Sequence, residues 1–424
     1  MSFLTSLLWL TLVAFADVPT PAQVERMIAG LRAPTRAARL KAEQEMLEAG
    51  PDLLPLLPPP ELVPSAARES LVRIRVTLER RQALLSIAPS HVTLQGERSF
   101  SEWVNELQRQ STNTNDLRSL SPTDLDQPLK LDFKDQTYWA GVEELSRMAR
   151  LKPDLSAGHL RWNPADPNVV PELAVTHAGA FRVAVIVART RPGLTADKPL
   201  VRLGLTLMAE PRLRPLFMHF SAEDMVLRGG SGALAAFNPE AKYELVLADG
   251  KSPPIQIDAV AQAPPPDTVD ISGRFRVTLA AGSEAIRFSD LPAFLEDKPS
   301  PVSRRRGGVT VTLQKVELEP ATDGKQNARI QVLVAYDTGG PAFESHRSWV
   351  QHNRVFLETA SGQTIELNGG QETTAEANGR VGAAYTFNDL TEPLANLRFV
   401  YVAPTLILET PVEFQFKQIP VTNR

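Results

Sequence analysis

The sequence predicts a multidomain α+β protein, and three observations lead to this fold class. The chain has 424 residues, more than one hydrophobic core usually serves. Apolar residues follow a helical period up to about residue 87, and β-type alternation replaces it from residue 169 onward. Between these two stretches a strand-and-helix pattern occurs twice. The predicted parts are a helical segment at 17–88, a small ββα-type interaction domain at 89–160, an antiparallel β-sandwich-like domain at 169–296, a linker at 297–308 and a second β-sandwich-like domain at 309–424.

The helical segment begins at Pro21, and its apolar residues recur at helical spacing. Its first two faces end before Gly50-Pro51, and a third helix follows a proline-rich turn at 57–60. The stretch 39–51, with 53–57 and 67–69, resembles a HEAT-like helical repeat. One such repeat cannot bury its own apolar face, so the resemblance implies that the segment packs against a neighbouring domain.

The doubled pattern lies between residues 91 and 151. Each half has a short alternating strand followed by a helix whose apolar residues fall at i, i+4 and i+7. Ser99 and Glu102 have the spacing of a capping box at the start of the first helix. The strand residues are Val92 and Leu94, then Leu129, Leu131 and Phe133; the helix residues are Phe100, Val104 and Leu107, then Tyr138, Val142 and Leu145. Two such units predict a small layer of two helices on a sheet.

This order of strand, helix, variable connection, strand and helix, with the stretch 131–135 leading into the second helix, resembles the short N-terminal domain of secretins and TonB-dependent receptors. The resemblance covers about 60 residues and implies a periplasmic interaction or signalling module without catalysis. Trp103 and Trp139 lie off the main apolar stripes. They are therefore the candidate residues of an exposed interaction surface, with partial burial against the helical segment as the alternative.

From residue 169 onward, strands rich in β-branched residues alternate with Gly and Pro turns, a pattern typical of sandwiches. Thr322-Asp323-Gly324-Lys325 predicts a hairpin turn, and the strand at 412–416 predicts a sheet edge that truncation would open. The other predicted strands are 181–187, 200–207, 243–247, 275–279, 309–313, 330–334, 354–357, 364–367, 384–387 and 397–402. The strands are too short and too mixed in composition for a membrane barrel with aromatic girdles.

The N-terminal residues predict an exported protein. Residues 1–16 form an apolar run that ends in Ala14-Phe15-Ala16, which fits a signal peptide with a cleavage site. The run lacks the usual basic residues, so an uncleaved anchor or a buried helix are the alternatives. The chain has no cysteine, which rules out disulfides and thiol catalysis. We therefore expect a periplasmic or extracellular protein without a membrane span after cleavage, and the net charge of -4 gives no case for nucleic acid.

Residues with catalytic or metal-binding potential do not form a recognisable constellation. His346 and His352, with Glu344 nearby, are spaced too far apart for one helical face. The carboxylate pairs Asp132 with Asp135 and Glu143 with Glu144 suit a helix N-terminus and a solvent-facing helix surface, respectively. The Gly-rich turn around Ser231 lacks a nucleophile-elbow pattern, and Arg304-Arg305-Arg306 reads as a solvated part of the linker. The sequence thus predicts no catalytic, cofactor or metal site.

The order of these parts, with Gly-x-Phe-Arg-Val strands and a terminal Phe-x-Phe-Lys strand, resembles uncharacterised exported multidomain proteins of planctomycete-type bacteria, and no activity carries over from that resemblance. The sequence predicts a non-enzymatic protein that acts in protein-protein interaction or scaffolding in the cell envelope, with unknown protein partners and no cofactor. The alternatives are a secretin-like or transport-associated envelope component and a carbohydrate-binding sandwich. Exposed aromatic residues clustered on one sandwich face would favour the last of these.

Overall fold

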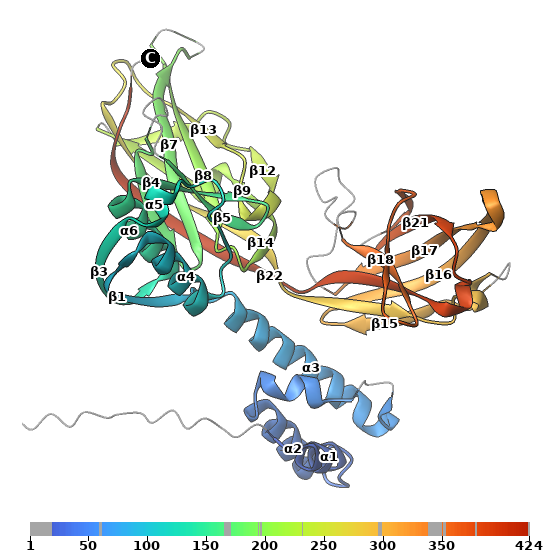
Figure 1. The fold of residues 1–424 in the computed structure, drawn as a ribbon. Coiled ribbons are helices and arrows are strands. Elements are labelled where there is room, and N and C mark those ends of the chain that lie inside the picture. The colour runs from blue at the N-terminus through green and yellow to red at the C-terminus, as the bar shows by residue number, and fades with distance from the viewer. Residues whose placement is uncertain are drawn as a thin grey trace, which may run out of the picture. The chain divides into compact units, whose positions relative to one another are not determined.

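The computed structural model describes residues 19–58, 62–164, 171–193, 195, 197–230, 232–295, 299–337, 350, 353–377 and 380–422. Helices come first along the chain, helices and strands alternate over residues 91–164, and strands predominate from residue 174 onward (Figure 1). The strands form several mostly antiparallel sheets, so the protein belongs to the mixed α+β class. The chain divides into two compact units, Met1–Leu84 and Leu85–Arg424. The predicted signal peptide at 1–16 lies outside the described residues.

The first unit consists of helices, as the apolar periodicity predicts. They are α1 (Pro21–Gly30), α2 (Arg36–Glu48), the short 3-10 helix η1 (Pro51–Leu56) and α3 (Ser65–Ser86). Thr20 and Gln23 form a capping box at the start of α1, which satisfies backbone donors that the first helical turn leaves without partners. The apolar stripes meet in one core that contains Val24, Leu31, Met46, Leu53, Leu71, Ile74 and Leu78.

The second unit begins with a two-helix region, residues 91–164. Its elements are β1 (His91–Ser99), α4 (Phe100–Ser111), β2 (Asn115–Asp116), α5 (Pro122–Leu125), β3 (Pro128–Thr137), α6 (Tyr138–Ala149), β4 (Leu151–Ser156) and β5 (His159–Pro164). β1 pairs with β3 in an antiparallel sheet, and β5 lies between β2 and β4 in a second sheet. The doubled strand-and-helix order and the Ser99 capping box are confirmed. The sheet formed by β2, β4 and β5 was not predicted.

The first β region comprises residues 171–279 and 408–422. Its elements are β6 (Ala174–Ala178), β7 (Phe181–Arg191), β8 (Leu200–Ala209), β9 (Arg214–Ser221), η3 (Ala222–Asp224), β10 (Met225–Gly229), β11 (Gly232–Ala236), β12 (Lys242–Val246), η4 (Ala248–Gly250), β13 (Ile255–Val260) and the first half of β14 (Thr268–Phe288). These strands belong to a 12-stranded sheet. Their inward side chains form a core with the C-terminal residues Val412, Phe414, Phe416 and Ile419.

The second β region comprises residues 280–407. Its elements are η5 (Leu291–Phe294), β15 (Val302–Arg306), β16 (Val309–Pro320), η6 (Thr322–Gly324), β17 (Gln326–Tyr336), β18 (Val355–Thr359), β19 (Thr364–Glu366), β20 (Gln371–Ala377), β21 (Arg380–Leu390), η8 (Leu394–Asn396) and the first half of β22 (Leu397–Pro420). Five of these strands form a separate sheet in the order β15, β16, β17, β21 and β20. The turn predicted at Thr322–Lys325 joins β16 to β17, with Asp323 and Gly324 at positive φ.

Two long strands connect the two β regions, which corrects the predicted boundaries. β14 and β22 pair antiparallel from Thr268 with Pro420 to Phe288 with Phe399. The sequence predicted separate strands at 397–402 and 412–416 and a domain that begins at 309. β22 instead runs through Pro404 and Pro411, and its C-terminal half returns to the first core. Both prolines stay in the pairing with β14, where Pro404 lies opposite Ser283 and Pro411 opposite Arg276.

The predicted linker at 297–308 also differs from the structure. Arg304, Arg305 and Arg306 belong to β15, which pairs with β16, and the Arg305 guanidinium contacts the Asp337 carboxylate. The alternation that marks a strand is hidden because three arginines occupy consecutive positions. The arginine run is therefore a charged edge strand rather than a solvated linker.

Candidate functional site

Trp103 and Trp139 are buried, and this corrects the prediction of an exposed interaction surface. Their side chains are 1% and 0% exposed. The Trp103 indole N–H donates to the carbonyl of Leu129 at 2.9 Å, and the Trp139 indole N–H donates to the carbonyl of Ala180 at 3.1 Å. The sequence suggests one buried stripe per helix, but α4 and α6 share a core with both small sheets and with Met208 of β8. A helix with partners on several sides also buries residues beside its main stripe.

Glu210, directly after β8, is the centre of a buried polar network between the two-helix region and the first β region. The Glu210 side chain is 0% exposed. Its carboxylate accepts hydrogen bonds from the Ser90 N–H at 2.8 Å, the Ser90 hydroxyl at 2.6 Å, the Asn113 amide at 3.1 Å and Arg212 Nε at 2.7 Å. Burial, with the Glu210 charge as a second cause, raises the pKa of the Tyr138 phenol well above its usual range. A buried carboxylate with this many donors holds the two regions in one arrangement.

Arg182 of β7 forms a second buried contact between the same regions. Its side chain is 2% exposed and lies between two carboxylates. Arg182 Nε donates to Glu143 Oε1 at 2.6 Å, and its terminal nitrogens donate to Glu172 at 3.1 and 2.5 Å. Burial raises the pKa of Glu143, but hydrogen bonds and charges from His177 and Arg182 outweigh this effect, so the net pKa is lowered. The expectation that Glu143 lies on a solvent-facing surface is therefore wrong.

The other carboxylates singled out in the sequence have local partners. Asp135 is not the N-cap of α6, which is Thr137; Asp135 lies at φ 51° with its carboxylate 3.0 Å from His91 Nδ1. Asp132 accepts from the Gln95 amide at 2.9 Å, and Glu144 pairs with Arg147 at 2.6 Å. His346, His352, Glu344 and Ser231 lie outside the described residues. Within the described ranges, no group of three or more His, Asp or Glu side chains is placed to hold a metal ion.

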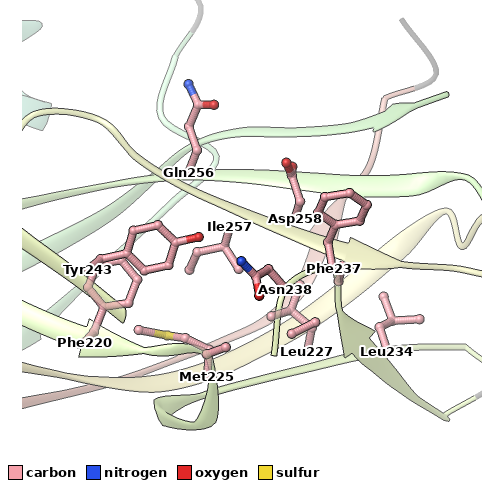
Figure 2. A pocket seen from close by; sticks show the side chains of 13 residues that line it. Phe220, Met225, Leu227, Leu234, Phe237, Asn238, Tyr243, Gln256, Ile257 and Asp258 are labelled. Carbon is pink, nitrogen blue, oxygen red and sulfur yellow. The ribbon is translucent and has the colours of Figure 1, made fainter. Parts of the chain in front are cut away.

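An apolar pocket in the first β region is the candidate binding site (Figure 2). It has a volume of about 80 Å³ and lies between β12 and β9 on one side and β10, β11 and β13 on the other. Its lining comes from five strands, the short helix η3 and the turn at Phe237-Asn238. The apolar lining consists mainly of Phe220, Met225, Leu227, Leu234, Phe237, Tyr243 and Ile257, and the polar lining of Asn238, Gln256 and Asp258.

Aromatic rings mark opposite ends of this pocket in Figure 2. Phe220 and Tyr243 are cross-strand neighbours on β9 and β12, and their rings stack with centroids 4.8 Å apart and planes 18° apart. At the other end, the backbone N–H of Phe237 donates to the carbonyl of Asp258 at 2.9 Å, which holds the Phe237 backbone beside β13. The stacked pair gives the pocket one ordered aromatic wall.

The carboxylate of Asp258, at the pocket wall, forms an ion pair. Arg202, its cross-strand partner on β8, donates to both carboxylate oxygens at 2.7 and 2.6 Å, and this interaction raises the pKa of Arg202. The amides of Asn238 and Gln256 are therefore the uncharged polar groups of the lining. The site can bind an apolar group and add a small number of hydrogen bonds, which is the usual composition of a recognition pocket.

Two of the aromatic residues that line the pocket are also exposed at the surface. Phe237 and Tyr243 are 45% and 41% exposed. We call these two residues the apolar rim. Sequence reasoning placed Tyr243 in a strand but did not identify the site, because the lining comes from five strands whose neighbourhood no local pattern reports. The turn Phe237-Asn238-Pro239, with an aromatic residue at its start, was the available local signal.

Comparisons with known proteins do not assign a family. No protein-family model matches the chain, and no curated protein matches it. One solved structure, described as the crystal structure of the conserved domain protein from Bacillus anthracis, is similar at 10% sequence identity and a TM-score of 0.17, over 59% of this chain and 93% of that chain. In the part of the chain that the structure describes, no helix is long and apolar enough to cross a membrane.

Proposed function

We propose that the protein is a non-enzymatic, exported protein-protein interaction or scaffolding component of the cell envelope. In this proposal residues 1–16 are a signal peptide, residues 17–88 form a HEAT-like segment, and residues 89–160 are a module like the short N-terminal domain of secretins and TonB-dependent receptors. The β regions are sandwich-like and carry the contact surface. The doubled strand-and-helix order of the two-helix region supports the resemblance.

The apolar rim beside the pocket is the observation that carries the proposal. Scattered exposed apolar residues are normal on protein surfaces, but exposed aromatic residues that line a pocket are typical of an interaction site. Phe237 lies in the turn after β11 and Tyr243 on β12, and both line the same pocket. Trp103 and Trp139, in contrast, are buried against other parts of the same chain. The apolar rim therefore replaces the two indoles as the proposed contact surface.

Capture of partners by the full chain tests this function. The wild-type protein and the variant Phe237→Asp are immobilised and incubated with envelope extract from the source organism. Leu295→Asp is the matched control because Leu295 is 41% exposed and lies in the second β region. We expect a defined set of envelope proteins that Leu295→Asp retains and Phe237→Asp loses. Equal capture by all three proteins, or no specific capture, would contradict the proposal.

Carbohydrate binding is the second candidate, and one observation favours it. Two exposed aromatic rings, Phe237 and Tyr243, lie on the same pocket as the amides of Asn238 and Gln256. Aromatic faces with nearby amides suit the apolar faces and hydroxyl groups of sugars. Binding to an array of soluble oligosaccharides that Tyr243→Leu abolishes and Leu295→Asp retains would support this candidate over the first. A protein that binds none of the oligosaccharides excludes it.

A further inference from the structure

Two uncharged polar groups face each other across the candidate pocket. The side chains of Asn238 and Tyr243 line it, and neither forms a hydrogen bond with a described residue. In Figure 2 the Tyr243 hydroxyl and the Asn238 amide point toward each other, and the Gln256 amide points away from both. The pocket therefore offers one amide and one hydroxyl, from different sides, to a ligand.

The charges around the pocket balance one another. Asp258 lines the pocket and is paired with Arg202. The exposed charged residues next to the lining in sequence are two acids and two bases: Glu223, Glu240, Arg228 and Lys242. These surroundings favour neither a cation nor an anion, and the burial of a charged group without a partner is costly. An uncharged ligand is therefore favoured.

The volume of the pocket limits the size of the group that it encloses. The volume of about 80 Å³ is roughly half that of a cavity of about 150 Å³ that holds benzene. By this comparison the enclosed group has about three or four non-hydrogen atoms. Met225, Leu227 and Leu234 lie along one side of the pocket in Figure 2 and make that side apolar. The group should thus combine a methyl with polar atoms that reach Asn238 and Tyr243.

An acetamido group meets these conditions. It is uncharged, and its non-hydrogen atoms are a methyl carbon, a carbonyl carbon and oxygen, and an amide nitrogen. Because the amide bond is trans, its C=O and N–H point in opposite directions. The Asn238 amide can donate to the carbonyl oxygen while the Tyr243 hydroxyl accepts from the N–H. The methyl then contacts the apolar side of the pocket.

Exposed aromatic rings beside the pocket suit the sugar that would carry this group. The Phe237 ring is 45% exposed, and the Tyr243 ring is held in place by its stacking on Phe220. We propose that the pocket binds the acetamido group of an N-acetylated sugar residue, whose ring lies against Phe237. This inference rests on carbohydrate binding, the second candidate function, and names the class of sugar.

Three trisaccharides with the same backbone test the ligand. Chitotriose carries acetamido groups, cellotriose carries hydroxyl groups in their place, and N-butanoyl chitotriose carries longer acyl chains. Isothermal titration calorimetry measures the Kd of each for the full chain. We expect chitotriose to bind at least about tenfold more tightly than cellotriose, which lacks the methyl and the amide. The butanoyl compound should lose a similar factor because its acyl chain is too long for the pocket.

Two conservative variants test the polar contacts. Asn238→Asp keeps the shape of the side chain and replaces the amide donor with a carboxylate, and Tyr243→Phe removes the hydroxyl but keeps the ring that stacks on Phe220. We expect chitotriose affinity to fall at least about tenfold for the first and about threefold for the second. Asn396→Asp is the matched control, because Asn396 is an exposed asparagine in the second β region, and it should bind like the wild type. Thermal unfolding of each variant verifies the fold.

The outcomes distinguish this inference from the proposed functions. Equal affinities for chitotriose and cellotriose overturn the acetamido inference and leave carbohydrate binding in place. Chitotriose binding that neither pocket variant weakens also overturns it, because the sugar then binds elsewhere. Tighter binding of an acetyl-lysine peptide than of chitotriose overturns the sugar as the source of the group. If no trisaccharide binds, the inference and the carbohydrate candidate both fail, and the capture of envelope proteins decides the interaction function independently.

Discussion

The first β region has two sides that differ in the burial of their large side chains. On the side that contacts the two-helix region, Trp139, Arg182 and Glu210 are buried and each has a hydrogen-bonding partner. Beside β12, Phe237 and Tyr243 are exposed around a pocket. The first side is covered by another part of the same chain, and we call it the closed side. The second side is not covered by a described part of the chain, and we call it the open side. Aromatic content alone does not distinguish them; the presence of partners within the chain does.

The closed side also changes how the two-helix region is understood. A mobile signalling module would need a small, polar contact with its neighbour. Here Met208 of the first β region packs in the core of the two-helix region, and two charged networks join them. We therefore expect the two regions to unfold as one cooperative unit.

Glu210→Ala should cause the largest loss of stability. It removes the acceptor of four hydrogen bonds and leaves the Arg212 guanidinium without its carboxylate partner. Breaking a buried charged pair in this way costs about 3 to 5 kcal/mol. Urea unfolding followed by circular dichroism measures the change. Glu413→Ala breaks the exposed pair with Arg274 and should cost less than about 1 kcal/mol. Similar values for both variants would show that the closed side is not a specific interface.

Trp139→Phe should destabilise the protein by about 1 to 3 kcal/mol, because it loses buried volume and the hydrogen bond to the Ala180 carbonyl. Trp103→Phe is the matched control: it loses a similar bond, to Leu129, but within the two-helix region. Hydrogen exchange of the backbone amides measures the destabilisation in both variants. We expect faster exchange in α6 and β7 for Trp139→Phe, and in α4 and β3 for Trp103→Phe. Identical exchange maps would contradict the assignment of Trp139 to the interface.

Acid should weaken the closed side through Glu143. A carboxyl group whose pKa is lower in the folded protein contributes stability above its unfolded pKa, near 4.5, and this stability is lost as the pH falls through the folded value. Glu143→Gln removes this titration. We expect the free energy of unfolding of the wild-type protein to fall more than that of Glu143→Gln as the pH is lowered from 5. Urea unfolding repeated at a series of acidic pH values measures both. Parallel curves would show that Glu143 does not stabilise the folded state through its charge.

Local patterns in the sequence predicted local structure well. The apolar spacing identified α4 and α6, the Ser99 capping box marked a helix start, and Thr322–Lys325 marked a hairpin turn. These features depend on residues within a few positions of one another, so a short stretch contains all the information. The α+β class follows from the same periodicities.

Long-range contacts were the part that the sequence did not predict. The sequence predicted separate strands at 397–402 and 412–416, but the pairing of β22 with β14 includes Pro404 and Pro411. Trp139 was expected to be exposed because its partner, the Ala180 carbonyl, lies 41 residues away. The candidate pocket was missed for the same reason, since its lining comes from five strands. Burial depends on neighbours in space, which spacing within one element does not report.

Phe237→Ser should have the smallest effect on stability and so tests the open side directly. Phe237 is 45% exposed, and the variant retains the backbone bond to the Asp258 carbonyl, so we expect a change of less than about 1 kcal/mol in urea unfolding. The same variant should also capture fewer envelope proteins than the wild-type protein, because the rim loses an aromatic wall of the pocket. A loss of several kcal/mol would instead place Phe237 in the core. The apolar rim would then be part of the folded framework, and the two sides of the first β region would no longer differ in kind.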